Sequence, residues 1–276
     1  MSSTVQEPQA DRTDLTGRRV VIPGGTGAVG EGIVRAWLRA GADVIVPSRS
    51  AERVAEFTDV LGDEANLGGL HFVVGDYTTF DGAETLAEQI THEFGAVTDV
   101  IASIGGWWQG KPLWDVSEAE WDRYFVGLTT AHVAQVRAWI PQLPREGTYQ
   151  LILGGSATTP VPGSSIINME QAALLMMRQV LAAEVGEQRR VTSLVLGPVT
   201  TRLRHRVDPT WVSSEDVGLA TAAVAAQPVV SAVDLELRSK ADLRELLQRL
   251  TGSSNSGDAG EWAGRPGDST EGEARA

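Results

Sequence analysis

A glycine-rich turn near the N-terminus is the first stretch whose residue types and spacing could do chemistry. In PGGTGAVG, Gly25, Gly27 and Gly30 have the spacing G-x-G-x-x-G, between the apolar run RRVVI and a segment of helical period. Such a turn lets backbone N–H groups approach a pyrophosphate at the N-terminus of a helix. A strand, the turn, a helix and a second strand follow one another here, as this motif requires. We therefore predict dinucleotide binding rather than a merely tight structural turn.

The residues after the second expected strand indicate which dinucleotide would bind. A carboxylate at this place would bond a ribose 2′-hydroxyl, but the sequence reads VPSRS. Arg49, flanked by Ser48 and Ser50, could instead hold a 2′-phosphate through charge-assisted hydrogen bonds. The alternative is that Arg49 is a solvated residue before a helix. We expect the cofactor to be NADP(H), preferred over NAD(H).

A second stretch, GSSIINMEQAALLMM, has the composition of a long apolar helix with polar residues in its first turns. These are Asn168, Glu170 and Gln171, and the stretch holds no tyrosine, lysine, cysteine or histidine. It offers two amides and one acid, without the other side chains that most often transfer protons. The alternative is that all three polar residues face solvent at a helix start.

The elements that must position these residues follow from the hydrophobic pattern. Short β-branched runs alternate with segments of helical period, which indicates a parallel sheet covered by helices on both faces. The spacing hydroxyl-x-x-acid at Ser117, Ser213 and Ser239 predicts helix starts. We predict one Rossmann-type, doubly wound α/β domain with about seven parallel strands, at 19–22, 43–46, 70–74, 99–104, 149–153, 191–196 and 232–237. Six helical stretches lie between them and a seventh follows at 241–250. The last strand alternates apolar and charged residues, as an edge strand does.

The two ends of the chain differ in composition from the part between them. Residues 1–14 are polar and are expected to form a flexible leader, and residues 15–250 are expected to form the dinucleotide-binding domain. Residues 251–276 are rich in glycine, serine and acids, with too little apolar surface to offset the entropy of ordering. We expect these last residues to be a disordered tail.

Composition excludes several classes of function. The chain has 276 residues, 42% of them hydrophobic, and no cysteine, so disulfides and thiolate chemistry are excluded. Its four histidines lack ligand-like spacing, and we expect no metal site. A net charge of −13 without a basic stripe disfavours nucleic acid as a partner. We find no secretory signal and no stretch that would span a membrane, so we expect a cytoplasmic protein without a membrane partner.

The chain resembles the short-chain dehydrogenase/reductase family from about residue 17 to 239. In PGGTGAVG, Gly24, Gly27 and Gly30 have the spacing of the family's extended subgroup. The resemblance implies cofactor contacts for this turn, for VVGDYT, for the SIGG stretch in place of the family's Asn-Asn-Ala-Gly, and for LGPVTTRL. The residues implicated are Gly24, Gly25, Thr26, Gly27, Val29, Gly30, Asp76, Tyr77, Ser103, Ile104, Gly105, Pro198, Val199, Thr200 and Thr201.

The resemblance also implies what this chain lacks. The family's reaction uses a Ser followed by Tyr-x-x-x-Lys, and the similarity places Ile167 and Gln171 where Tyr and Lys would stand. Ser156 lies close to the Ser position, with Gly154 or Gly155 as alternative equivalents. Gln171 could then bond the ribose as Lys would, without adding charge. Ser156 and Glu170 become the candidate catalytic residues.

Trp107 and Trp108 follow the position where the family has its substrate pocket. A paired indole there could form an apolar wall for a planar ligand, and the alternative is core or subunit packing.

Three functions are compatible with these features. The first is an NADP(H)-dependent oxidoreductase that acts on a small carbonyl or alcohol substrate through a non-standard active site. The second is a regulator or sensor that binds the dinucleotide without turnover, and the third is a non-redox enzyme of the cyclase or lyase type. We expect a homodimer or homotetramer, formed through the helices of AHVAQVRAWI and AALLMMRQVLAAEV as is common in the family.

Overall fold

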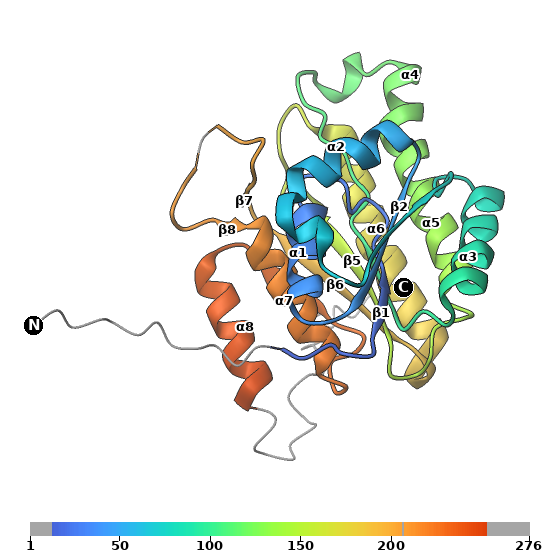
Figure 1. The fold of residues 1–276 in the computed structure, drawn as a ribbon. Coiled ribbons are helices and arrows are strands. Elements are labelled where there is room, and N and C mark those ends of the chain that lie inside the picture. The colour runs from blue at the N-terminus through green and yellow to red at the C-terminus, as the bar shows by residue number, and fades with distance from the viewer. Residues whose placement is uncertain (1–12, 206, 253–276) are drawn as a thin grey trace, which may run out of the picture.

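The computed structural model describes residues 13–205 and 207–252 (Figure 1). The leader expected at residues 1–14 and the tail expected at 251–276 lie outside the described residues, apart from 13, 14, 251 and 252. Within the described part of the chain, no helix has both the length and the apolar character that a membrane span requires.

A seven-stranded parallel sheet forms the centre of the fold, as predicted. Its strand order is β3-β2-β1-β4-β5-β6-β9, and the register aligns Val21 with Ile45 on one side and Val100 on the other. The strands are β1 (Arg19–Val21), β2 (Asp43–Ser48), β3 (Leu70–Val74), β4 (Asp99–Ala102), β5 (Thr148–Gly154), β6 (Arg190–Leu196) and β9 (Asp234–Leu237). In β9, Leu235 and Leu237 are buried and Glu236 is exposed, which confirms the one-sided edge strand.

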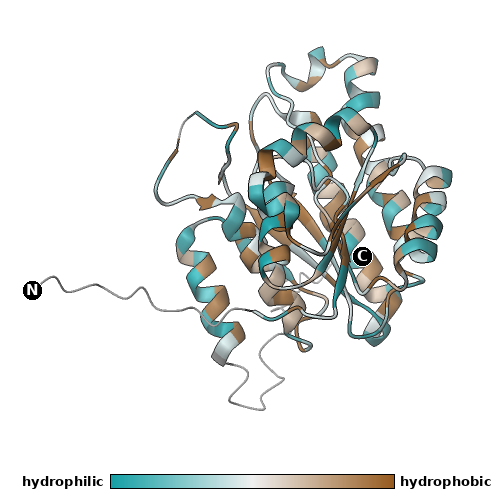
Figure 2. Cartoon of the chain, in the orientation of Figure 1, coloured by the Kyte–Doolittle hydropathy of each residue, from teal (hydrophilic) through white to brown (hydrophobic). Residues whose placement is uncertain are grey.

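Helices cover both faces of the sheet, which confirms the doubly wound arrangement (Figure 1). Alternate strand residues serve opposite layers, since Val20 packs in one hydrophobic cluster and Val21 in the other. The first layer holds α1 (Gly30–Arg39), α2 (Ala51–Leu61), α7 (Ser214–Ala226) and α8 (Lys240–Gly252). The second holds α3 (Phe80–Phe94), α5 (Gly127–Trp139) and α6 (Ser165–Val185). Figure 2 shows apolar segments concentrated in the sheet between these layers.

Several short elements were not predicted. The helix that leads into α5 begins as α4 (Glu118–Trp121), with the predicted capping box at Ser117, and passes through a π-helical turn, η3 (Asp122–Val126). Two short strands, β7 (Val199–Thr200) and β8 (Val212–Ser213), pair beside the main sheet. The remaining short helices are η1 (Gly62–Asn66), η2 (Leu113–Asp115), η4 (Gly155–Ala157) and η5 (Gly186–Gln188).

Candidate active site

Two adjoining cavities open at the carboxyl ends of the strands. They measure about 420 Å³ and about 640 Å³, and both are lined by Gly27 and by the stretch Ser103–Gly106 after β4. In a doubly wound sheet this edge is where ligands bind, because the loops after successive strands meet there.

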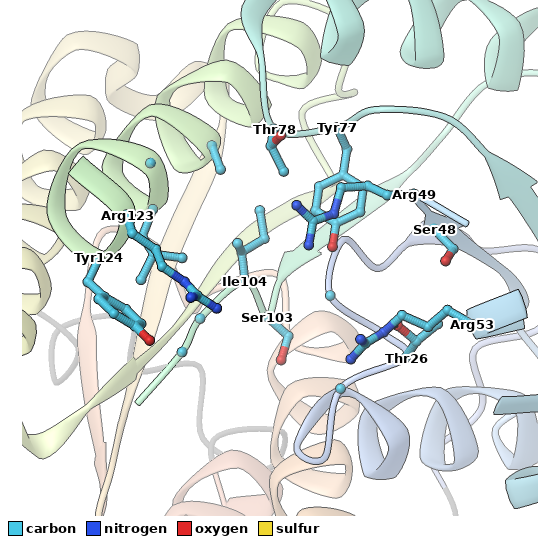
Figure 3. A pocket seen from close by; sticks show the side chains of 17 residues that line it. Thr26, Ser48, Arg49, Arg53, Tyr77, Thr78, Ser103, Ile104, Arg123 and Tyr124 are labelled. Carbon is cyan, nitrogen blue, oxygen red and sulfur yellow. The ribbon is translucent and has the colours of Figure 1, made fainter. Parts of the chain in front are cut away.

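The smaller cavity lies between the glycine turn, the ends of β2 and β3, and the π-turn η3 (Figure 3). Its charged lining residues are Arg49, Arg53 and Arg123. No carboxylate in the described part of the chain lies within ion-pair distance of these three guanidinium groups. Of the predicted cofactor residues, Gly24, Thr26, Gly27, Ser48, Arg49, Tyr77, Ser103, Ile104 and Gly105 line it.

The glycine turn fits closely against the end of β4. Gly24 has φ +81°, and a Cβ at this residue would lie 2.2 Å from the carbonyl oxygen of Ser103. A Cβ at Gly30, the first residue of α1, would lie 2.3 Å from the carbonyl oxygen of Gly24. Only residues without a side chain fit at these two places, so the backbone of the turn can come close to a ligand. Gly25 belongs to the turn but does not line either cavity.

The hydroxyl groups of the residues after β2 make other hydrogen bonds than the sequence led us to expect. The Ser48 hydroxyl is buried and donates to the Ser50 carbonyl at 3.1 Å, while the Ser50 hydroxyl accepts the Arg53 N–H and caps α2. Both hydroxyls are thus engaged within their own segment, and Ser50 does not line the cavity. Arg49 lies over the Tyr77 ring, 6.0 Å from its centroid, and Arg53 donates through Nε to the Thr26 hydroxyl at 3.4 Å.

Arg53 and Arg123 line the smaller cavity but were not predicted from the sequence. Arg53 could have been found, because it lies in the first turn of the helix that begins two residues after Arg49. Arg123 reaches the cavity from a π-turn that the sequence did not predict.

Asp76 lies apart from the cavity wall that was predicted for it. Its carboxylate accepts hydrogen bonds from the Thr78 N–H at 2.8 Å and from the hydroxyls of Thr78 and Thr79. Burial opposes ionisation, but these hydrogen bonds, with the charge of Arg49, hold the pKa of Asp76 below its usual value. The neighbours Tyr77 and Thr78 line the cavity instead.

The larger cavity has a mostly apolar wall. Of the predicted residues, Gly27, Val29, Gly30, Ser103, Ile104, Gly105, Trp107, Ser156, Gln171, Pro198 and Val199 line it. Trp107 is 61% exposed at this wall, whereas Trp108 does not line it and donates its indole N–H to Glu120 at 3.4 Å. The paired indole wall is therefore wrong, and one indole takes part. Arg204 and Arg238 also line the cavity and were not predicted.

The segment after β6 reaches the cavity with only its first half. Pro198 and Val199 line it, whereas Thr200 and Thr201 do not. The Thr200 hydroxyl is buried without a partner among the described residues.

Gln171 joins the start of α6 to the end of β5. Its Oε1 accepts the Gly154 N–H at 2.6 Å, and its Nε2 donates to Glu170 Oε2 at 2.7 Å. Gln171 lines the larger cavity, as does Ile167 one turn earlier.

Glu170 was a candidate catalytic residue, with solvent exposure as the alternative; it is fully buried, so the alternative is wrong, and it does not line either cavity. Its Oε1 has no partner among the described residues. Burial raises the pKa of Glu170 to about 7, against the opposing effect of the hydrogen bond from Gln171. Glu170 therefore lies behind Gln171, as the second layer of the wall.

Asn168 holds the loop that follows β5. Its side-chain oxygen accepts the Val161 N–H at 3.0 Å, and its amide group donates to the carbonyls of Ser156 and Thr159 at 2.7 and 2.8 Å. The alternative of a solvent-facing Asn168 is wrong, because all of these bonds are to one loop. That loop carries Ser156, Thr159 and Val161 at the cavity wall.

No group of three or more histidine or acidic side chains that could hold a metal ion occurs among the described residues.

The short chain dehydrogenase family model matches residues 18–211. Among relatives, the uncharacterised oxidoreductase YvrD of Bacillus subtilis is 26% identical over 190 residues, covering 68% of this chain and 70% of that protein. The cis-2,3-dihydrobiphenyl-2,3-diol dehydrogenase of Paraburkholderia xenovorans is 27% identical over 195 residues, covering 69% of each.

Two solved structures share the fold. A gluconate 5-dehydrogenase from Burkholderia cenocepacia, in complex with NADP and tartrate, has a TM-score of 0.72 at 17% identity, covering 83% of this chain and 96% of that one. A short chain oxidoreductase from Pseudomonas aeruginosa, described as containing an atypical catalytic center, has a TM-score of 0.72 at 17% identity, covering 82% and 97%. Because the family match spans more than half of the sequence, the chain belongs to the short chain dehydrogenase family of oxidoreductases, whose members bind a nicotinamide dinucleotide.

Proposed function

We propose that the protein is an NADP(H)-dependent oxidoreductase that interconverts a small carbonyl compound and its alcohol through a non-standard active site. The observation that carries this proposal is the adjacency of two different cavities along the stretch Ser103–Gly106. One is lined by arginines and the glycine turn and suits phosphates, and the other is apolar and suits an organic substrate.

The residues present fit NADP(H). Gly24 and Gly30 leave the turn backbone open to a pyrophosphate, and a Cβ at Gly105 would meet nothing within 4 Å, so this stretch has room beside a ligand. Arg49 and Arg53 would hold the 2′-phosphate, since neither has a carboxylate partner among the described residues. When bound, the nicotinamide supplies or accepts a hydride.

The proton would follow a path different from that of the family's Tyr and Lys. Ile167 and Gln171 would occupy the Tyr and Lys places, and the wall of the larger cavity has no Asp, Glu, His, Lys or Tyr among the described residues. The Ser156 hydroxyl reaches this wall, so it would donate a hydrogen bond to a substrate oxygen and exchange its proton with water. The solved neighbour described as having an atypical catalytic center supports this kind of departure.

Glu170 would act as a positioning residue. It does not line the cavity and hydrogen-bonds Gln171, which does; the amide of Gln171 does not relay a proton as an acid or a hydroxyl would. The carboxylate orients the amide, and the amide orients the Gly154 end of β5. The role of a direct proton donor, which the sequence suggested for Glu170, therefore passes to Ser156 and water.

The substrate would be aromatic or otherwise apolar. Two of the relatives are named for aromatic substrates, a dihydrobiphenyl diol and a hydroxynaphthalene. The larger cavity offers Trp107, Ile152 and Val161 for such a ring.

The proposal is tested in two steps with the full-length protein. Calorimetric titration should show that NADPH binds more tightly than NADH. A panel of aromatic aldehydes and ketones should then include at least one compound that oxidises the bound NADPH. The oxidation is measured as a decrease in the absorbance of NADPH. Loss of absorbance without any carbonyl compound serves as the background.

A second candidate, a dinucleotide-binding regulator, is favoured by one observation. The larger cavity presents no acid or base side chain other than its two arginines, among the described residues. Tight NADPH binding without oxidation by any compound in the panel would favour this second function.

We also infer association through α5 and α6. The outer faces of these helices expose apolar side chains, including Val133, Met176 and Val180. Light scattering at micromolar concentration should show a dimer or a tetramer, and a monomer would contradict this inference.

A further inference from the structure

We propose that the larger cavity binds a carboxylate, or a similar oxyanion, carried on an apolar body, and that Arg204 and Arg238 recognise it. As a statement about the substrate this inference rests on the function proposed above, whereas the binding of an anion can be tested without turnover.

The cavity walls carry positive charge although the chain as a whole has a negative net charge. The protein carries 36 acidic and 23 basic residues, not counting histidine. Yet, among the described residues, those with charged side chains that line the two cavities are all arginines: Arg49, Arg53 and Arg123 in the smaller one, and Arg204 and Arg238 in the larger. A cleft lined by charge of one sign raises the local concentration of ligands of the opposite sign.

The phosphates of a dinucleotide account for the smaller cavity and leave the larger one unexplained. Arg204 and Arg238 do not line the smaller cavity, and they come from other elements, the β7–β8 connection and the end of β9. A second anion, separate from the cofactor, is the ligand that this second pair of arginines fits.

Arg204 supplies a positive charge that no carboxylate of the described residues pairs with. Its guanidinium lies over the Trp211 ring, 4.9 Å from the centroid, and Nη1 donates to the Val199 carbonyl at 3.3 Å. The indole thus supports the guanidinium while hydrogen-bond donors stay free for an oxyanion.

Arg238 contributes less than Arg204, because its Nε and Nη2 pair with Glu236 and its Nη1 donates to the Thr159 hydroxyl at 3.4 Å, which leaves one Nη1 donor for a ligand. Its backbone N–H donates to Asp242 at 2.8 Å, and Nη2 donates to the Thr158 hydroxyl at 2.8 Å. These bonds fix Arg238 beside η4, since a Cβ at Gly155 would lie 3.2 Å from its Nη1.

The other side chains of the cavity wall indicate what the rest of the ligand is like. Trp107, Ile152, Val161 and Ile167 contribute apolar surface to a cavity of about 640 Å³. An aromatic carboxylate combines this apolar body with the anion.

Calorimetric titration with 2-naphthoate and with 2-naphthamide tests the proposal, because the two differ in charge and neither accepts a hydride from NADPH. We expect naphthoate to bind about tenfold more tightly, as for one charge-assisted contact. Arg204→Gln should reduce this preference to less than about twofold, and Arg204→Lys, which keeps the charge, should retain part of it. Arg238→Gln should weaken naphthoate by a smaller factor than Arg204→Gln does.

Arg202→Gln is the matched control, because Arg202 lies two residues away, pairs with Glu31 and does not line the cavity. It should leave the preference unchanged. Equal affinities for the two probes, or a preference that survives both Arg204→Gln and Arg238→Gln, would overturn the proposal.

The same variants separate this inference from the proposed function. If Arg204→Gln weakens NADPH and leaves the naphthoate preference intact, Arg204 belongs to the cofactor site and the inference is wrong. If the preference follows Arg204 while no carbonyl compound oxidises NADPH, the anion site stands and the oxidoreductase proposal fails.

Discussion

The two cavities differ in what shapes their walls. The smaller one depends on backbone, because Gly24 and Gly30 bring the turn against β4 and against itself. The larger one depends on side chains of α6, whose partners lie in a different segment: Gln171 with Gly154, and Asn168 with the loop that ends at Val161. A backbone site is thus encoded by the spacing of a few glycines, whereas a side-chain site needs contacts that no local pattern contains.

The largest effect should come from Gly24→Ala. A Cβ there would lie 2.2 Å from the Ser103 carbonyl oxygen, and the residue has positive φ, so the turn must move. We expect about 3 kcal/mol to be lost from the free energy of unfolding, from left-handed backbone strain together with overpacking. Urea denaturation and NADPH calorimetry measure the two consequences.

Gly68→Ala is the control for this variant, because its Cβ would meet nothing within 4 Å. It should change the stability by less than about 1 kcal/mol. If Gly24→Ala were equally mild, the contrast between a backbone-defined and a side-chain-defined cavity would not hold.

Glu170→Gln should show how much the burial of an ionised carboxylate in α6 lowers the free energy of unfolding. Burial raises the pKa of Glu170 from 4.5 to about 7. The contribution of Glu170 to the free energy of unfolding is therefore fully present below about pH 4.5. It is lost as the pH rises toward 7, because Glu170 ionises at a lower pH in the unfolded chain than in the folded protein. At about pH 8 the variant should be more stable than the wild type by up to about 3 kcal/mol, and at about pH 4 nearly equal.

Urea denaturation across this pH range measures the difference. The amide of the variant still accepts the hydrogen bond from Gln171 Nε2, so lost hydrogen bonding should not mask the effect. A variant that is less stable than the wild type at every pH would show that burial does not penalise the ionised carboxylate.

Arg49→Ala should separate the two cofactors. NADPH should bind about 1 to 3 kcal/mol more weakly, the range for a charge-assisted contact, and NADH should be nearly unaffected. Arg53→Ala should act in the same direction, since Arg53 lines the same wall. Arg145→Ala removes an exposed arginine elsewhere and should change neither affinity; equal losses for both cofactors in Arg49→Ala would refute the 2′-phosphate contact.

Substitutions at the front of α6 should have the smallest effects. Gln171→Ala should lower NADPH affinity by about 0.5 to 1.5 kcal/mol, the net value of one neutral hydrogen bond, if the second N–H of Nε2 donates to the cofactor ribose. Ile167→Val should leave turnover within a few-fold, because an aliphatic side chain transfers no proton. Abolished turnover in correctly folded Ile167→Val would mean that the helix is aligned wrongly with the family.

The sequence predicted the features that depend on local patterns and missed those that depend on contacts between distant side chains. Alternating apolar runs were enough for the seven strands and the wet face of β9, because sheet period and burial are local properties. The helical period would also have indicated that Glu170 is buried, since this residue lies between Ile167 and Leu174 on the apolar face of α6.

Convergence between distant segments could not be predicted in this way. Arg123, Arg204 and Arg238 come from three separate parts of the chain and line the cavities only because the fold brings their loops together. Likewise, nothing near Asn168 indicated that its side chain would hold the loop after β5.

The most direct test of the central claim is the rate of hydride transfer from NADPH to an aromatic carbonyl compound, measured in single turnover between about pH 7.5 and 9.5. In this range Glu170 is largely ionised, and the larger cavity has no acid or base other than arginine among the described residues. We expect that transfer occurs and that its rate varies by less than about threefold across this range. Absence of transfer despite NADPH binding, or a change of about tenfold per pH unit with a pKa inside the range, would contradict it.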